Sequence, residues 1–103
     1  MRFGERIREL RNSAGLSQKV LSERLGIGDA YLSKIENQHL DFGDYPSEKM
    51  IQKLAIELEA DEDELMILAE KVPEKVRKRF LERPDVFLKL VGMSDEELDK
   101  TIG

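Results

Sequence analysis

Polar and small side chains recur at helical spacing in one short stretch of the chain. They are Asp29, Ala30, Ser33, Lys34 and Asn37. Side chains of this kind, gathered on one helix face, form hydrogen bonds with a polar surface. A second polar group, Ser17, Gln18 and Lys19, stands at an expected helix start, where side chains and backbone N–H groups could meet a phosphate.

The residue inventory argues against catalysis. The chain has one histidine, His39, and no cysteine. It has neither a glycine-rich phosphate loop nor a histidine pair for zinc. The acidic runs at 61–64 and 95–97 fall at expected helix starts, where carboxylates complement the helix dipole. We therefore predict that the protein is not an enzyme and has no metal site and no cofactor.

Two short helices and a tight turn are expected to position the polar residues. Gly26 falls where the first helix ends and the backbone needs a positive φ, which glycine adopts without strain. Small Ser22 lets the helices approach, and apolar residues fill the corner between them: Leu21, Leu25, Ile27, Leu32 and Ile35. Residues 17–37 therefore read as a helix-turn-helix. An ordinary αα-hairpin is the alternative.

Charge is distributed unevenly along the chain. The net charge of −5 over 103 residues argues at first against a nucleic-acid partner. Residues 1–40, however, carry seven Arg or Lys against five Asp or Glu, whereas residues 41–72 carry three against ten. A modestly basic face with an acidic back would bind DNA and limit non-specific attraction. Without cysteine or a long apolar run, we expect a cytoplasmic protein with no membrane segment.

Apolar periodicity and caps predict the other helices of the first domain. One amphipathic helix covers Phe3 to Ala14. After a loop at 38–46, Ser47 caps a helix that continues to Glu59. Asp61 starts a fifth helix, and its expected inward face consists of Leu65, Ile67, Leu68 and Ala69.

Three shorter helices are expected beyond residue 72. Pro73 suits a first helical position, Pro84 ends that helix, and Ser94 opens a capping box for the last one. The apolar stripe along this segment consists of Val76, Phe80, Phe87, Leu90 and Val91. It must pack on the first five helices or on a second copy, and we favour the second copy. The chain is thus divided into a domain at 1–71 and a helical extension at 72–103.

The motifs of the first domain are similar to those of a known family. They comprise residues 11–18, Ser22, residues 25–27, residues 31–37, Pro46 with Ser47, and residues 53–55. Together they resemble the helix-turn-helix proteins of the phage repressor and Cro type, the Xre-like family, over residues 3 to about 69. The resemblance implies an all-α, lambda-repressor-like domain of five helices that binds DNA without a cofactor.

The resemblance also implies individual roles. The residues implied on the sugar-phosphate backbone are Ser17, Gln18 and Asn37. Those implied in the major groove are Asp29, Ala30, Ser33 and Lys34. There Lys34 could donate to guanine, Asp29 could accept from cytosine, and Ala30 could touch a thymine methyl. Arg11 and Glu36 correspond to an ion pair that ties the first helix to the third.

Two departures from the family pattern concern charge. Asp29 stands where many relatives have a polar or basic residue, and a carboxylate near phosphates is repulsive unless it faces a base amino group. Asp41 and Asp44, in a loop longer than usual, replace expected cations. Phosphate binding is therefore expected to depend on Arg and Lys side chains elsewhere, such as Lys19 and Lys34.

Two further residues have open roles. Tyr31 either stacks along a backbone sugar or packs partly against the domain. His39 could contact a phosphate or respond to pH, although a lone loop histidine usually does neither.

The leading hypothesis is a transcriptional regulator, a repressor, that binds a pseudo-palindromic operator in double-stranded DNA as a homodimer. The alternative is an antitoxin-like interaction module whose C-terminal helices bind a partner protein. Residues 72–103 discriminate between these two hypotheses.

Overall fold

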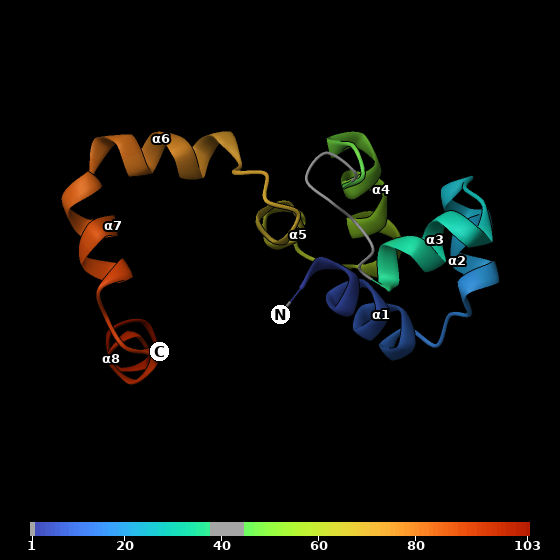
Figure 1. The fold of residues 1–103 in the computed structure, drawn as a ribbon, viewed down its shortest axis with the longest axis horizontal. Coiled ribbons are helices and arrows are strands. Elements are labelled where there is room, and N and C mark those ends of the chain that lie inside the picture. Colours follow the sequence, from blue (N-terminus) through green and yellow to red (C-terminus); the bar gives the residue numbers. More distant parts are fainter. Residues whose placement is uncertain (1, 38–44) are drawn as a thin grey trace. The chain divides into compact units, whose positions relative to one another are not determined.

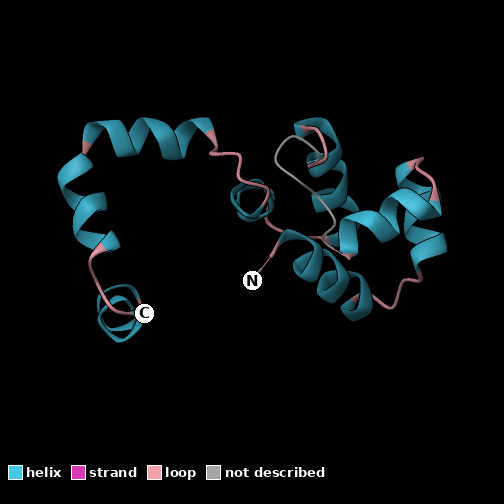
Figure 2. Ribbon diagram, in the orientation of Figure 1, coloured by secondary structure: helices cyan, strands magenta, loops and turns pink. Residues whose placement is uncertain are grey.

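The computed structural model describes residues 2–37 and 45–103, and every regular element within these ranges is an α-helix (Figures 1 and 2). The predicted all-α class is confirmed. The chain divides into two compact units, Met1–Lys71, called unit 1 here, and Val72–Gly103, called unit 2. Three residues of the expected loop, His39, Asp41 and Asp44, lie outside the described residues.

The described residues of unit 1 form five helices. They are α1 (Phe3–Ser13), α2 (Gln18–Leu25), α3 (Asp29–Glu36), α4 (Glu48–Leu58) and α5 (Glu62–Leu68). The helix α3 packs against α1 and α2, while α4 packs against α2 and α5 (Figure 1). The helix that precedes the helix-turn-helix in the sequence, α1, and the helix that follows it, α4, therefore both pack against it.

One apolar core holds unit 1 together. Its buried members are Phe3, Ile7, Leu21, Leu25, Leu32, Ile35, Ile51, Leu54, Ala55, Leu58, Leu65, Met66 and Ala69. The ring of Tyr45 packs edge-on against that of Phe3, with centroids 6.0 Å apart. Burial of this size is the main stabilising contribution to a small domain.

The predicted caps start the helices. The hydroxyl of Ser17 accepts a hydrogen bond from the backbone N–H of Val20, and that of Ser47 accepts from Met50. The carboxylate of Asp61 accepts from the N–H groups of the first turn of α5. Each cap satisfies a donor that the helix itself leaves unpaired.

The expected inward face of α5 is wrong at one position. Ile67 is about half exposed, at 51%, whereas Met66 is buried together with Leu65 and Ala69. The helical period gives the reason, because a residue two positions after Leu65 points to nearly the opposite side of the helix.

Unit 2 consists of α6 (Glu74–Glu82), α7 (Pro84–Val91) and α8 (Asp95–Ile102). Pro73 precedes α6 as its N-cap instead of occupying the predicted first helical position, and Pro84 begins α7. The capping box predicted at Ser94 and Glu97 is present. No helix in the described part of the chain is long and apolar enough to cross a membrane.

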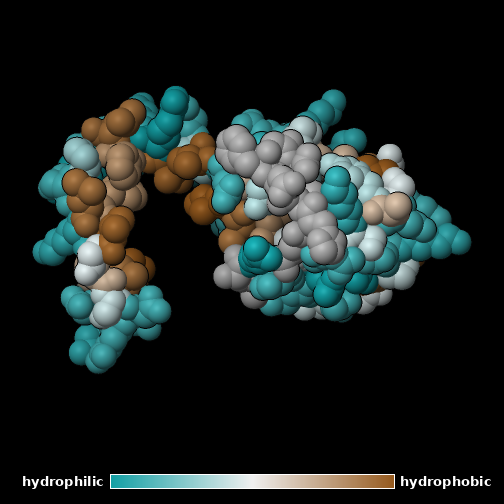
Figure 3. Space-filling view, in the orientation of Figure 1, coloured by the Kyte–Doolittle hydropathy of each residue, from teal (hydrophilic) through white to brown (hydrophobic). Residues whose placement is uncertain are grey.

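The helices α6 and α7 contact each other through aromatic rings. The centroids of Phe80 and Phe87 lie 5.3 Å apart with the rings tilted by 53°. None of the three helices of unit 2 contains a buried residue. In the space-filling view, apolar surface gathers over this unit (Figure 3).

A strained backbone position ends α4 and provides a test of the fold. Glu59 has a φ of 51°, in the left-handed region that favours glycine. We expect Glu59→Gly to raise the free energy of unfolding by about 0.5–1 kcal/mol, measured by urea denaturation, because glycine removes the Cβ strain. As a control, Lys53→Gly in the interior of α4 should lower it by about 1 kcal/mol. A loss of stability in both variants would contradict this geometry.

Candidate nucleic-acid interface

The turn between α2 and α3 sets the position of α3. Gly26 adopts a left-handed conformation with φ 70° and ψ 32°, and the N–H of Ile27 bonds the carbonyl of Ser22 at 3.0 Å. Gly28, at the N-cap position, then begins α3. Leu32 and Ile35 of α3 are fully buried against the core. The opposite side of α3 is consequently left at the surface.

The predicted base-reading residues lie on that open side of α3. Asp29, Ala30 and Lys34 are exposed, and Ser33 is partly exposed. Tyr31 is also open to solvent, with 38% of its surface exposed. The helix α3 therefore has an apolar inner side, which is buried, and a polar outer side, which is exposed. This is the pattern of a helix that can enter the major groove of DNA.

A buried carboxylate joins α3 to α1. The side chain of Glu36 has no exposed surface, and its two oxygens accept from Nε and Nη2 of Arg11 at 2.8 and 2.9 Å. Nη1 of Arg11 donates to the carbonyl of Leu16 at 2.9 Å. The hydrogen bond to Glu36 raises the pKa of the Arg11 guanidinium above its ordinary value, against the opposing effect of burial. Such a bidentate pair is both strong and directional.

The same carboxylate contacts Gln18 directly and is linked through Arg8 to Asn37, two of the predicted phosphate contacts. Nε2 of Gln18, in the first turn of α2, donates to Oε1 of Glu36 at 3.3 Å. Arg8 of α1 donates to Oδ1 of Asn37 at 2.5 Å, and Nδ2 of Asn37 donates to Oγ of Ser33 at 3.1 Å. Three of the predicted contacts, Gln18, Ser33 and Asn37, are therefore joined by one polar network.

Arg8 is the member of this network that the sequence did not single out. It precedes Arg11 by three positions, so both lie on the same side of α1. That spacing is the signal that could have identified it. Its Nε lies 3.5 Å from Oε1 of Glu36.

Asp29 is turned toward α2. Its Oδ1 accepts from the hydroxyl of Ser22, a side chain that is 1% exposed. The same hydroxyl also lies 2.9 Å from the carbonyl oxygen of Lys19. A serine has one proton to donate, and the charged carboxylate is the stronger acceptor. Asp29 thus links the first residue of α3 to α2, and its charge also suits the N-terminus of α3.

Several predicted residues remain apart from this network in the described part of the chain, including Ala30, Tyr31 and Lys34 on the exposed side of α3. Ser17 caps α2, and Lys19 is exposed in the first turn of that helix. The predicted dimer residues, Val76, Phe80, Phe87, Leu90 and Val91, all belong to unit 2. Among these, Val91 is the most open, with 81% of its surface exposed.

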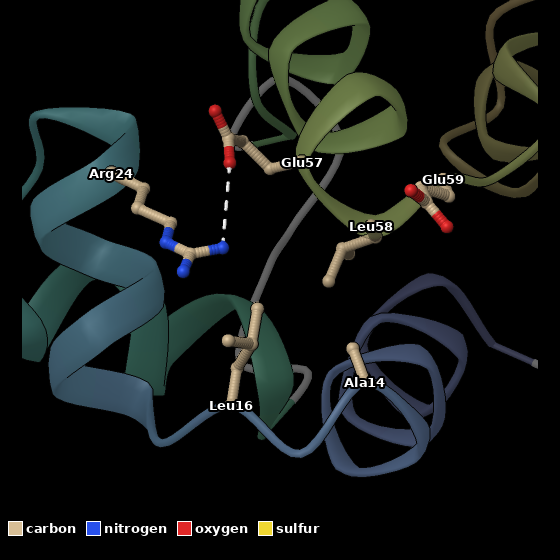
Figure 4. A pocket seen from close by; sticks show the side chains of 6 residues that line it. All are labelled: Ala14, Leu16, Arg24, Glu57, Leu58 and Glu59. Atoms are coloured by element: carbon tan, nitrogen blue, oxygen red, sulfur yellow. Dashed lines mark ion pairs between the residues drawn. The ribbon is translucent and has the colours of Figure 1, made fainter.

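A hollow of about 270 Å³ opens on unit 1 between α1, α2 and α4 (Figure 4). Its lining residues are Ala14, Leu16, Arg24, Glu57, Leu58 and Glu59. Arg24 and Glu57 approach to 4.0 Å within it, so the cation already has a partner (Figure 4). In the ranges that the structure describes, no three His, Asp or Glu side chains gather to hold a metal ion.

Comparison with known proteins agrees with the geometry of α2 and α3. Residues 7–65, more than half of the chain, match the helix-turn-helix family, a DNA-binding regulatory family, and the chain belongs to it. The resemblance seen in the sequence is thereby confirmed. A stretch of 36 residues, 35% of the chain, is 53% identical to the propionyl-CoA carboxylase regulator of Cereibacter sphaeroides. The chain spans only 8% of the length of that relative.

The contact between Ser22 and Asp29 leads to a prediction of coupled stability. We expect Ser22→Ala and Asp29→Ala each to lower the free energy of unfolding by about 1 kcal/mol, because each removes one side of a hydrogen bond between helices. The double variant should lose less than the two losses combined, by about 0.5–1 kcal/mol. Chemical denaturation of the four proteins measures this coupling.

A matched control uses Glu62, which like Asp29 is an acidic first residue of its helix in unit 1. Ser22→Ala and Glu62→Ala should be additive, because no hydrogen bond joins these two side chains. Additivity in the Ser22 and Asp29 pair as well would show that the helices are not linked there.

Proposed function

We propose that the protein is a transcriptional repressor that binds a pseudo-palindromic operator as a homodimer. The observation that carries this proposal is the polar outer side of α3, next to which Gln18 of α2, Ser33 of α3 and the C-cap Asn37 are held in one network with Glu36. One recognition helix covers few base pairs, and two copies on half-sites one helical turn apart supply the selectivity that a genome requires. The regulator named among the relatives supports the same class.

The proposed contacts divide into two kinds. Base reading falls to exposed residues of α3, namely Asp29, Ala30, Ser33 and Lys34. Backbone contact falls to Ser17, Gln18, Lys19, Tyr31 and Asn37. Oδ1 of Asp29 already accepts a hydrogen bond from Ser22. The other carboxylate oxygen would therefore accept the hydrogen bond from a cytosine amino group.

We propose that unit 2 supplies the dimer contact. Its three helices have eight or nine residues each and contain no buried residue. Isolated helices of this length are marginal in water, and chains below about 40 residues rarely build a stable core alone. Exposed apolar side chains, including Leu81, Leu88 and Val91, would be covered by the same unit of a second copy.

The exposed apolar side chains of unit 2 also favour a second candidate function. An antitoxin-like protein would use the same helices to bind a different protein. One molecule can be both a repressor and an antitoxin. The two candidate functions are distinguished by the molecule that binds unit 2, which is a second copy of this chain in one and a different protein in the other.

Lys34 and Gln18 provide the test of DNA recognition. Selection from random duplex DNA with the wild-type protein should enrich an inverted repeat. On that sequence, Lys34→Ala should cost about 1–3 kcal/mol of binding and relax the preference at one base position. Gln18→Ala should weaken binding to all sequences alike, since a phosphate contact carries no sequence information.

Two results would contradict the proposed recognition. Failure of the folded wild-type protein to enrich any sequence would contradict the proposal that it recognises an operator. Enrichment of a sequence to which both variants bind as tightly as the wild type would instead show that α3 is not the reading helix.

Val91 provides the test of the dimer. Val91→Asp should weaken self-association by about 2 kcal/mol or more, measured by light scattering across a concentration series, because a buried interface penalises an unpaired charge. The control is Ile56→Asp, which changes an exposed apolar residue of unit 1 and should leave the dimer intact. An unaltered dimer in the Val91 variant, or a monomer in the control, would place the contact outside unit 2.

A further inference from the structure

The charge of Arg8 is not required to neutralise the buried carboxylate of Glu36. Glu36 already has a bidentate partner in Arg11, whose side chain is only 12% exposed. The side chain of Arg8 is 45% exposed, and its nearest approach to the carboxylate is 3.5 Å. Two guanidinium groups thus face one carboxylate, which leaves one positive charge in excess at the surface.

The excess charge is held at the C-terminal end of α3. Nη2 of Arg8 donates to Oδ1 of Asn37 at 2.5 Å and approaches the backbone carbonyl of Glu36 at 3.4 Å. A cation here also suits the negative end of the helix dipole. Stabilisation of α3 alone is therefore the simpler role, and it must be separated from any role in binding.

The donors of Arg8 and Asn37 that are not used for folding point to a ligand class. The amide of Asn37 gives one N–H of Nδ2 to Ser33 and keeps a second. Among the residues that the structure describes, none accepts a hydrogen bond from Nη1 of Arg8. A guanidinium and an adjacent amide N–H are suited to the oxygens of one phosphate.

We infer that Arg8 and Asn37 together bind one phosphate of the DNA backbone at the end of α3. This inference rests on the proposed function, and it adds a cation on α1 to the lysines expected from the sequence. Arg8 acts in two ways: it fixes the orientation of the Asn37 amide, and it supplies the charge that the amide lacks.

The salt dependence of binding tests the charge. On the selected operator, Arg8→Gln should reduce the slope of log K against log salt concentration by about 0.9 for each copy bound, because one ion is no longer released. The matched control is Arg24→Gln, since Arg24 is similarly exposed at 51% but pairs with Glu57 away from α3. The control should keep the wild-type slope, whereas a role confined to stabilising α3 would lower the melting temperature of Arg8→Gln and leave its slope unchanged.

DNA in which single phosphates are neutralised tests which phosphate Arg8 contacts. Methylphosphonate substitution, one phosphate at a time, should identify one site per half-site where Arg8→Gln loses clearly less affinity than the wild type. Arg8→Lys, which keeps the charge, should show a loss between those of the wild type and Arg8→Gln at that same site, and Arg24→Gln should show the full loss.

The outcomes separate the inference from the function it rests on. Absence of specific binding by the wild type overturns the proposed function. Specific binding with equal losses at every phosphate in the wild type, Arg8→Gln and Arg8→Lys overturns the phosphate contact alone. If Arg8→Gln did not fold, the Arg8→Lys comparison would decide the question.

Discussion

The buried carboxylate of Glu36 is the constraint on which the candidate interface depends. A charge without exposed surface costs several kcal/mol in general unless partners compensate it, and here Arg11 of α1 and Gln18 of α2 both donate to it. Because Glu36 is the last residue of α3, a single group joins three helices at their polar ends. Electrostatic pairing therefore orients α3 together with the apolar core, which contains Leu32 and Ile35 from the same helix.

Features encoded locally could be predicted from the sequence. The caps at Ser17 and Ser47 and the left-handed turn at Gly26 depend on neighbouring residues, and the structure contains all of them. The inward position predicted for Ile67 is wrong, and the helical period alone is enough to exclude it, because Leu65 lies on the buried side of α5. The family resemblance implied a pair of Arg11 and Glu36, and these side chains do meet.

The polar contacts that link different helices could not be predicted. Asp29 bonds Ser22 across the turn, and Arg8 bonds Asn37 across 29 positions of sequence. Both contacts depend on how α3 lies against its neighbours, and a pattern of residue types along the chain does not contain that geometry. Unit 2 presents a related case, because its apolar side chains are exposed and their pattern along the chain does not specify which surface would cover them.

The network around Glu36 has a consequence for the entropy of binding. Long polar side chains that are free in solution lose rotamer freedom when they meet a ligand, typically about 0.5–1.5 kcal/mol each. In this protein Arg8, Gln18 and Asn37 are already hydrogen-bonded before any ligand arrives. Their ordering is part of the folding equilibrium, so the affinity of the surface and the stability of the domain are thermodynamically linked.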